Sequence, residues 1–155
     1  MWTWLIIFGV VAVALAPLTH FMPTKRQRAV ASMREYAAVN GLFVEFRKFP
    51  GGDERPWPAE RPSGDVIYYG KRLPAKGRRD SVSANWRRDK QGWCSVGNYA
   101  AVPEYLEELG PEILGASRDD SSCGVYWVES GGESGVEQIR GALQRWSDEI
   151  ATLVR

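Results

Sequence analysis

An uncharged, apolar run at the N-terminus limits what this chain can fold into more than any other feature. Residues 1–24 contain no Asp, Glu, Lys or Arg. The polar side chains between residues 2 and 22 are Thr3, Thr19 and His20. A helix over this stretch has about the length, roughly 20 residues, that crosses the hydrocarbon core of a bilayer. The run therefore predicts a transmembrane anchor over residues 1–23.

The two flanks of the run differ, and this difference predicts an orientation. Trp2 and Trp4 lie at one end, where aromatic rings favour the headgroup level of a bilayer. The cations at the other end are Lys25, Arg26 and Arg28. Because cationic flanks stay on the cytoplasmic side, we expect a single-pass protein of a bacterial inner membrane, with the N-terminus outside and residues 24–155 in the cytoplasm. Cys94 and Cys123 would then be reduced thiols rather than a disulfide.

Two other interpretations of the run remain open. Ala14, Leu15 and Ala16 match the small-residue pattern of a signal-peptide cleavage site. No cation precedes the run, however, and Pro17 would follow directly on the cut, so a retained anchor is favoured. A helix buried in a soluble core is disfavoured because the run is apolar on every face.

Length and charge restrict the rest of the chain. The 155 residues are enough for one domain beside the N-terminal run, and the formal net charge of +1 gives no general attraction to nucleic acid. The charges are unevenly distributed: residues 71–90 are mostly basic and residues 104–137 mostly acidic. We expect neither nucleic acid nor a metal ion as a partner.

The pattern of apolar residues after residue 23 predicts an α+β domain. We expect a helix over residues 24–40, which Asn40 and Gly41 would end, and a helix from Pro103 with Leu106, Leu109 and Ile113 on its inward face. A third helix is expected from Gly135 to the C-terminus, where Ser134 and Glu137 would form a capping box. Strands are predicted over residues 42–49, 65–73 and 123–130, and a hairpin over residues 81–97 with its turn at residues 89–92. The proline- and glycine-rich residues 50–64 predict a long loop. This order implies a mainly antiparallel sheet covered by helices.

The C-terminal helix has the clearest periodicity. Its apolar residues recur at spacings of three and four, at Val136, Ile139, Leu143, Trp146, Ile150 and Leu153. This apolar stripe predicts packing on the sheet of the same domain. It also leaves open a contact between Trp146 and a partner protein.

No catalytic motif stands out. No histidine follows His20, which excludes a histidine-based triad in the domain. Residues 129–135, "ESGGESG", form a glycine-rich turn before a helix but lack the lysine of a P-loop. Cys94 and Cys123 lie in aromatic-rich stretches typical of buried, inert thiols. We therefore expect no enzyme activity and no cofactor.

Two groups of residues are candidates for binding. Trp57, between Pro56 and Pro58, is held in a stiff loop and is a candidate contact for a protein partner, or a lid on its own core. A set of cations is a candidate for facing anionic lipid: Lys71, Arg72, Lys76, Arg78 and Arg79. A solvated basic loop would explain the same cations.

The N-terminal arrangement resembles a known family. An apolar run, then "MPTKRQR", then a helix containing Met33 is similar to the YajC-type accessory subunit of the bacterial preprotein translocase, over roughly the first 35 residues. The resemblance implies a short outer end, a single span, and a basic cluster at the cytoplasmic boundary. It brings no functional residue to this chain.

The sequence thus predicts a non-catalytic accessory or binding module of a membrane complex. Three alternatives stay open: a translocase-associated subunit, an adaptor that faces anionic lipid, and a small enzyme with a carboxylate- or thiol-based site.

Overall fold

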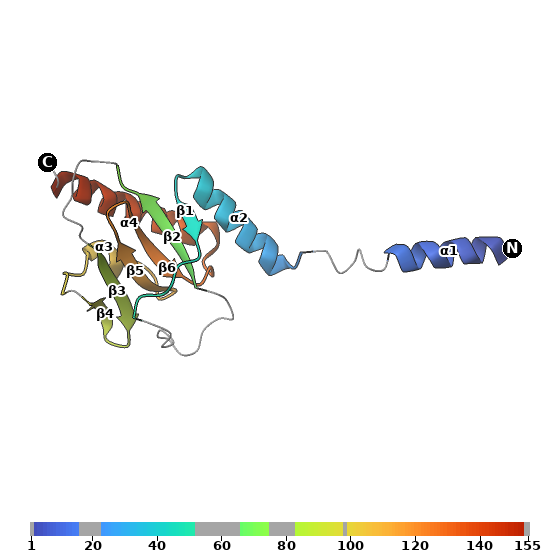
Figure 1. The fold of residues 1–155 in the computed structure, drawn as a ribbon, viewed down its shortest axis with the longest axis horizontal. Helices are drawn as coiled ribbons and strands as arrows, with labels where there is room; N and C mark the ends of the chain where they lie inside the picture. The colour runs from blue at the N-terminus through green and yellow to red at the C-terminus, as the bar shows by residue number, and fades with distance from the viewer. Residues whose placement is uncertain (1, 16–22, 52–65, 75–82, 98, 154–155) are drawn as a thin grey trace.

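A computed structural model describes residues 2–15, 23–51, 66–74, 83–97 and 99–153. The elements in chain order are α1 (Trp2–Leu15), α2 (Lys25–Val39), β1 (Phe43–Glu45), β2 (Ile67–Arg72), β3 (Ala84–Asp89), β4 (Gly92–Val96), α3 (Glu104–Glu107), β5 (Ile113–Arg118), β6 (Ser122–Trp127) and α4 (Gly132–Leu153). Figure 1 shows α1 apart from a domain that contains all the other elements. The protein is therefore α+β, as the sequence predicts.

The strands of the domain form one six-stranded sheet in the order β1-β2-β6-β5-β3-β4, and every neighbouring pair is antiparallel. The predicted hairpin is confirmed as β3 and β4, in which Asp89 pairs with Gly92 and Arg88 with Trp93. The guanidinium of Arg88 lies 5.7 Å from the centre of the Trp93 ring. The central strands β6 and β5 join the β1-β2 half of the sheet to the β3-β4 hairpin.

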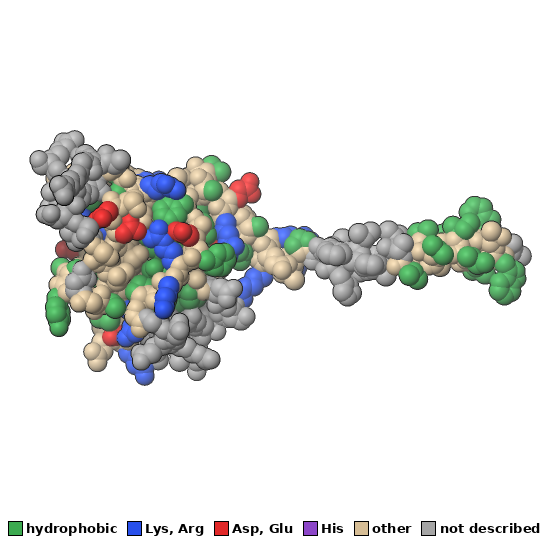
Figure 2. All heavy atoms as spheres, in the orientation of Figure 1, with side chains coloured by type: hydrophobic (Ala, Val, Ile, Leu, Met, Phe, Trp, Pro, Cys, Tyr) green, Lys and Arg blue, Asp and Glu red, His purple; other side chains and the backbone are tan. Residues whose placement is uncertain are grey.

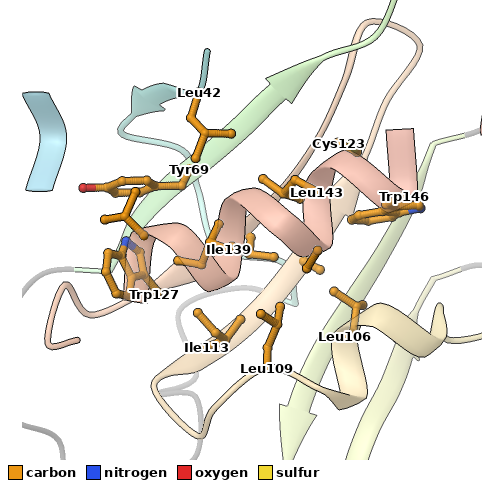
Figure 3. Packing of buried hydrophobic residues seen from close by; sticks show 14 of the residues in the cluster. Leu42, Tyr69, Leu106, Leu109, Ile113, Cys123, Trp127, Ile139, Leu143 and Trp146 are labelled. Atoms are coloured by element: carbon orange, nitrogen blue, oxygen red, sulfur yellow. The ribbon is translucent and has the colours of Figure 1, made fainter. Parts of the chain in front are cut away.

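Helices α2 and α4 cover one face of the sheet, and the main core lies beneath them (Figure 1). The apolar stripe of α4 is buried at Val136, Ile139, Leu143, Trp146 and Ile150, which confirms its packing on this domain. In Figure 3, Ile139, Leu143 and Trp146 extend from α4 among buried residues of the strands and of the segment around α3. Because side chains alternate along a strand, Ile67 and Tyr69 of β2 face this core.

Aromatic rings cover the opposite face of the sheet, and two glycines leave space for one of them. Tyr68 of β2 is fully buried there, and its ring centre lies 4.9 Å from that of Tyr126 on β6. Gly70 and Gly124 pair across β2 and β6, and both lack the Cβ atom that would collide with the Tyr68 ring. The guanidinium of Arg47 covers Tyr68 from outside, 4.3 Å from the ring centre. The sheet is thus buried on both faces in its middle.

Three local predictions differ from the structure. The sequence places Ile113 on a helix, but α3 ends at Glu107 and Ile113 begins strand β5. The strand predicted over residues 42–49 is limited to Phe43–Glu45. Helix α4 begins at Gly132, and the Ser134 hydroxyl donates a hydrogen bond to the Gly131 carbonyl (2.9 Å) instead of capping the helix.

The predicted transmembrane anchor is wrong. Within the residues that the structure describes, no helix combines the length and the apolar character needed to span a bilayer. Helix α1 has 14 residues. The expected single-pass placement in a bacterial inner membrane, with the N-terminus outside and the domain cytoplasmic, rested on that span and is overturned with it.

Asp119 closes the turn between β5 and β6. Its carboxylate accepts hydrogen bonds from the backbone N–H of Ser121 (2.8 Å) and of Ser122 (2.7 Å), from both serine hydroxyls (2.9 Å each), and from the Arg47 guanidinium (3.1 Å). Partial burial opposes ionisation, but these hydrogen bonds outweigh it and lower the pKa of Asp119 to about 2.

We expect this carboxylate to make the domain acid-sensitive. Its pKa is lower in the folded protein than the usual 3.8, so its stabilising contribution is complete above about pH 4 and is lost as the pH falls through about 2. Urea unfolding at pH 2 to 5 should show a smaller loss of stability toward low pH for Asp119→Asn than for the wild type. The same acid dependence in both proteins would contradict a low pKa at Asp119.

Candidate functional site

The most unusual surface of the molecule is helix α1. Trp2, Trp4 and Phe8 are exposed, as are the aliphatic side chains Leu5, Ile6, Ile7, Val10, Val11 and Val13. Figure 2 shows apolar side chains along both visible edges of this helix. Soluble proteins rarely expose contiguous apolar patches of this kind unless something binds them.

Helix α2 connects this surface to the domain and begins with a stable cap. The Thr24 hydroxyl accepts a hydrogen bond from the backbone N–H of Gln27 (3.2 Å), and the Gln27 side chain accepts one from the Thr24 N–H (2.8 Å). This capping box confirms the predicted start of the helix. Met33 and Ala37 are buried against the core, so one side of α2 is fixed to the domain.

Polar contacts along α2 and α4 hold the two helices together. Ser32 donates a hydrogen bond to Glu133 (2.8 Å), and Tyr36 donates one to Glu137 (3.2 Å). Figure 1 shows the C-terminal end of α2 beside the domain and its N-terminal end directed toward α1. The contacts therefore fix the orientation of α2 on the domain.

A buried ionic cluster anchors the same helix near the end of β6. The Arg34 guanidinium donates two hydrogen bonds to the Glu129 carboxylate, each of 2.8 Å, and the Tyr69 hydroxyl donates a third (2.9 Å). Glu129 has a φ of 50°, a left-handed conformation that is costly for a residue other than glycine. Three bonds from α2 and β2 hold this strained residue in place.

The ionic states within this cluster follow from its surroundings. The hydrogen bond to Glu129 raises the pKa of the Arg34 guanidinium, in spite of its partial burial. Burial first, and then the negative charge of Glu129, raise the pKa of the Tyr69 hydroxyl far above its usual value. Arg34 therefore stays a cation and Tyr69 a hydrogen-bond donor at neutral pH. The cluster has the properties of a structural clamp, with no nucleophile in it.

The structure separates the residues that the sequence singles out for binding. Trp2 and Trp4 lie on α1, and Lys25, Arg26 and Arg28 are exposed at the start of α2. Lys71 and Arg72 lie at the end of β2, where the Arg72 guanidinium is 5.6 Å from the Phe43 ring centre. Trp57, Lys76, Arg78 and Arg79 lie outside the described residues. A lipid-facing role for Lys71 and Arg72 stays a prediction.

Trp146 is part of the core. Its ring packs edge-on against Trp86, with the ring centres 5.5 Å apart. The two thiols also have structural positions. Burial raises the pKa of Cys123 to about 12, so it is a neutral thiol at physiological pH, and the Cys94 Sγ donates to the Arg87 carbonyl (3.3 Å). The described part of the chain contains no group of three or more His, Cys, Asp or Glu side chains that could hold a metal ion.

Sequence reasoning missed the Arg34–Glu129 clamp. The two residues are 95 positions apart, and no sequence pattern links them. The sequence singled out only the glycine-rich turn at residues 129–135, which begins with Glu129 but lacks the lysine of a P-loop. In the structure Glu129 in this turn is paired with a cation of the same chain.

Comparisons with protein-family models, with curated proteins and with solved structures find no match for this chain. Three features of the structure bear on function. Helix α1 is apolar and exposed, the first turns of α2 are basic, and α2 is clamped to the domain.

Proposed function

We propose that the protein is a non-catalytic accessory module that joins a larger protein assembly through α1. The observation that supports this most is the exposure of large apolar side chains on all sides of that helix. Burying one such side chain is worth about 1.5–3 kcal/mol. Because the helix has no polar face, its partner has to enclose it, as helices of a bundle enclose a central one, rather than cover one side.

The residues after α1 suggest a second property of the partner. Lys25, Arg26 and Arg28 lie on the exposed N-terminal turns of α2. Cations at this end oppose the helix dipole, and α2 has no acidic residue in its first turn to offset them. A partner with acidic side chains beside its apolar site would stabilise this arrangement. We therefore expect a protein that has an apolar channel with an acidic rim.

The test is site-specific cross-linking in the native cell. A photoreactive amino acid replaces Phe8 on α1 in the full-length, tagged protein, and Phe46 on the domain serves as the matched position. Both phenylalanines are strongly exposed, at 69% and 74%. We expect cross-links to one apolar protein segment from position 8 only, and a complex of fixed stoichiometry after purification in mild detergent.

A pair of double variants tests the energetic role of α1. Phe8→Gln with Val13→Gln removes two exposed apolar side chains from α1, and Phe46→Gln with Val39→Gln removes the same types from the domain. We expect the amount of complex recovered to fall at least tenfold for the α1 variant and to stay unchanged for the domain variant. Cross-links from position 8 to lipid alone, or equal complex formation by both variants, would overturn the proposal. A translocase component as the partner would support the resemblance noted in the sequence.

A further inference from the structure

A cavity of about 480 Å³ lies at the end of the domain where the C-terminal half of α4 meets α3. Its lining includes residues of β3, β5, α3 and α4, and of the segment that precedes α3. Small-molecule sites in proteins are commonly about 300–1,000 Å³, with mainly apolar walls and a few polar groups. The volume is therefore suited to one small organic molecule.

The inner wall of the cavity is aromatic and well fixed. Trp86 and Trp146 form the edge-to-face pair described above, and both are buried. The indole N–H of Trp86 lies within hydrogen-bond distance of the carbonyls of Ala100 (3.3 Å) and Ala101 (3.2 Å), which also line the cavity. These contacts hold the loop wall against the core. An apolar group of a ligand would meet a preformed surface here.

Three charged residues line the cavity, and none of them forms an ion pair with another residue that the structure describes. Arg118 at the end of β5 is half-buried, and Glu104 at the start of α3 is exposed. A third charged residue, Glu149 on α4, accepts a hydrogen bond from the Tyr105 hydroxyl. The cavity thus offers one cation and two carboxylates.

We propose that this cavity binds a small aminocarboxylate zwitterion with an apolar body, such as a free hydrophobic amino acid. The ligand carboxylate pairs with the Arg118 guanidinium, which matches a carboxylate with two parallel N–H donors. The ligand ammonium group lies near Glu104 and Glu149, and its side chain packs toward Trp86 and Trp146. A simple anion would be repelled by the two carboxylates, and a simple cation would make no favourable contact with the Arg118 guanidinium. The inference does not depend on α1 or on its partner.

The test is calorimetric titration of the full-length protein, in one detergent buffer throughout, with a matched series of ligands. L-Tryptophan and L-leucine carry both charges and an apolar side chain. Tryptamine lacks the carboxylate, indole-3-propionate lacks the amine, and N-acetyl-L-tryptophanamide lacks both charges. We expect the complete amino acids to bind, and each truncated ligand to bind at least tenfold more weakly, because each loses a charge-assisted contact.

Variants then locate the binding. Arg118→Gln should weaken L-tryptophan binding by about tenfold to hundredfold while leaving the weak tryptamine binding unchanged. Arg140→Gln, an arginine on the N-terminal half of α4 that does not line the cavity, is the control and should bind as the wild type does. If Arg118→Gln fails to fold, Glu104→Gln tests the other charge, with an expected loss for L-tryptophan but not for indole-3-propionate. Absence of amino-acid binding, or equal affinity across the ligand series, would overturn the proposal.

Discussion

Gly124→Ala is expected to be the most destabilising single methyl addition in the sheet. A Cβ atom at this position would lie 2.5 Å from both the hydroxyl oxygen of Tyr68 and the backbone carbonyl oxygen of Tyr69. The carbonyl belongs to the neighbouring strand, which pairs with β6, so it cannot move without breaking that pairing. Overpacking of a close-packed interior costs about 1–3 kcal/mol and sometimes more.

We expect a loss of about 3 kcal/mol in the free energy of unfolding, which lowers the melting temperature by roughly 6–12 °C for a domain of this size. Gly141→Ala on α4 is the matched control, because a Cβ atom there would meet no other atom within 4 Å. In a helix interior this change should stabilise by about 0.5–1 kcal/mol. Thermal and urea unfolding of the two variants measures both effects. Equal stabilities would mean that the Tyr68 ring does not pack on Gly124.

The parts of the fold that sequence predicts well are those with a strong local signal. The stripe from Val136 to Ile150 has helical spacing, and all its described members are buried on the sheet. The hairpin of β3 and β4 is predicted by its polar turn, and the Arg88–Trp93 pair follows from the register that this turn sets. Asn40 and Gly41 end α2 as expected, with Gly41 at a positive φ of 77°.

The parts that sequence reasoning misplaced depend on distant residues. Strand β5 is buried on both faces, so its residues show no alternation of apolar and polar types, and Ile113 looked like the continuation of a helix. The face covered by Tyr68 depends on Gly70 and Gly124, which come together only when β2 pairs with β6. Hydrophobicity alone overestimated the N-terminal run, because within the described residues no helix is long and apolar enough to span a bilayer.

The candidate sites were less predictable than the fold because their residues are distant from one another in the sequence. The charges of the cavity come from α3, β5 and α4, and only the packing of α4 on the sheet brings Arg118 near Glu104 and Glu149. The composition of α1 led to the prediction of a transmembrane anchor, which is wrong.

Arg34→Met, which breaks the Arg34–Glu129 clamp, should lower the free energy of unfolding by about 2–3 kcal/mol. The change removes two hydrogen bonds from the Glu129 carboxylate, whose side chain is only 6% exposed, and leaves a buried anion with the Tyr69 hydroxyl as its remaining partner. Breaking a buried pair by removing one partner typically costs 3–5 kcal/mol. The partly exposed position of Arg34, at 37%, reduces this value.

Arg140→Met is the matched control. Arg140 is also 37% exposed and forms the same two-bond pair with a glutamate, but that glutamate, Glu137, is 45% exposed and can be solvated by water. Pairs of this kind contribute about 0–1 kcal/mol, so Arg140→Met should change the stability very little. The two arginine variants differ mainly in the burial of the carboxylate left behind, and urea unfolding at neutral pH compares them directly.

A double variant shows whether the buried charge is the cause. Adding Glu129→Gln to Arg34→Met removes the uncompensated anion and should recover part of the loss, because a neutral amide is less costly to bury than a carboxylate. If Arg34→Met costs no more than Arg140→Met, or if Glu129→Gln deepens its effect, the ion pair does not hold α2 to the domain. The left-handed backbone at Glu129 would then have to be held by the packing of the turn into α4 alone.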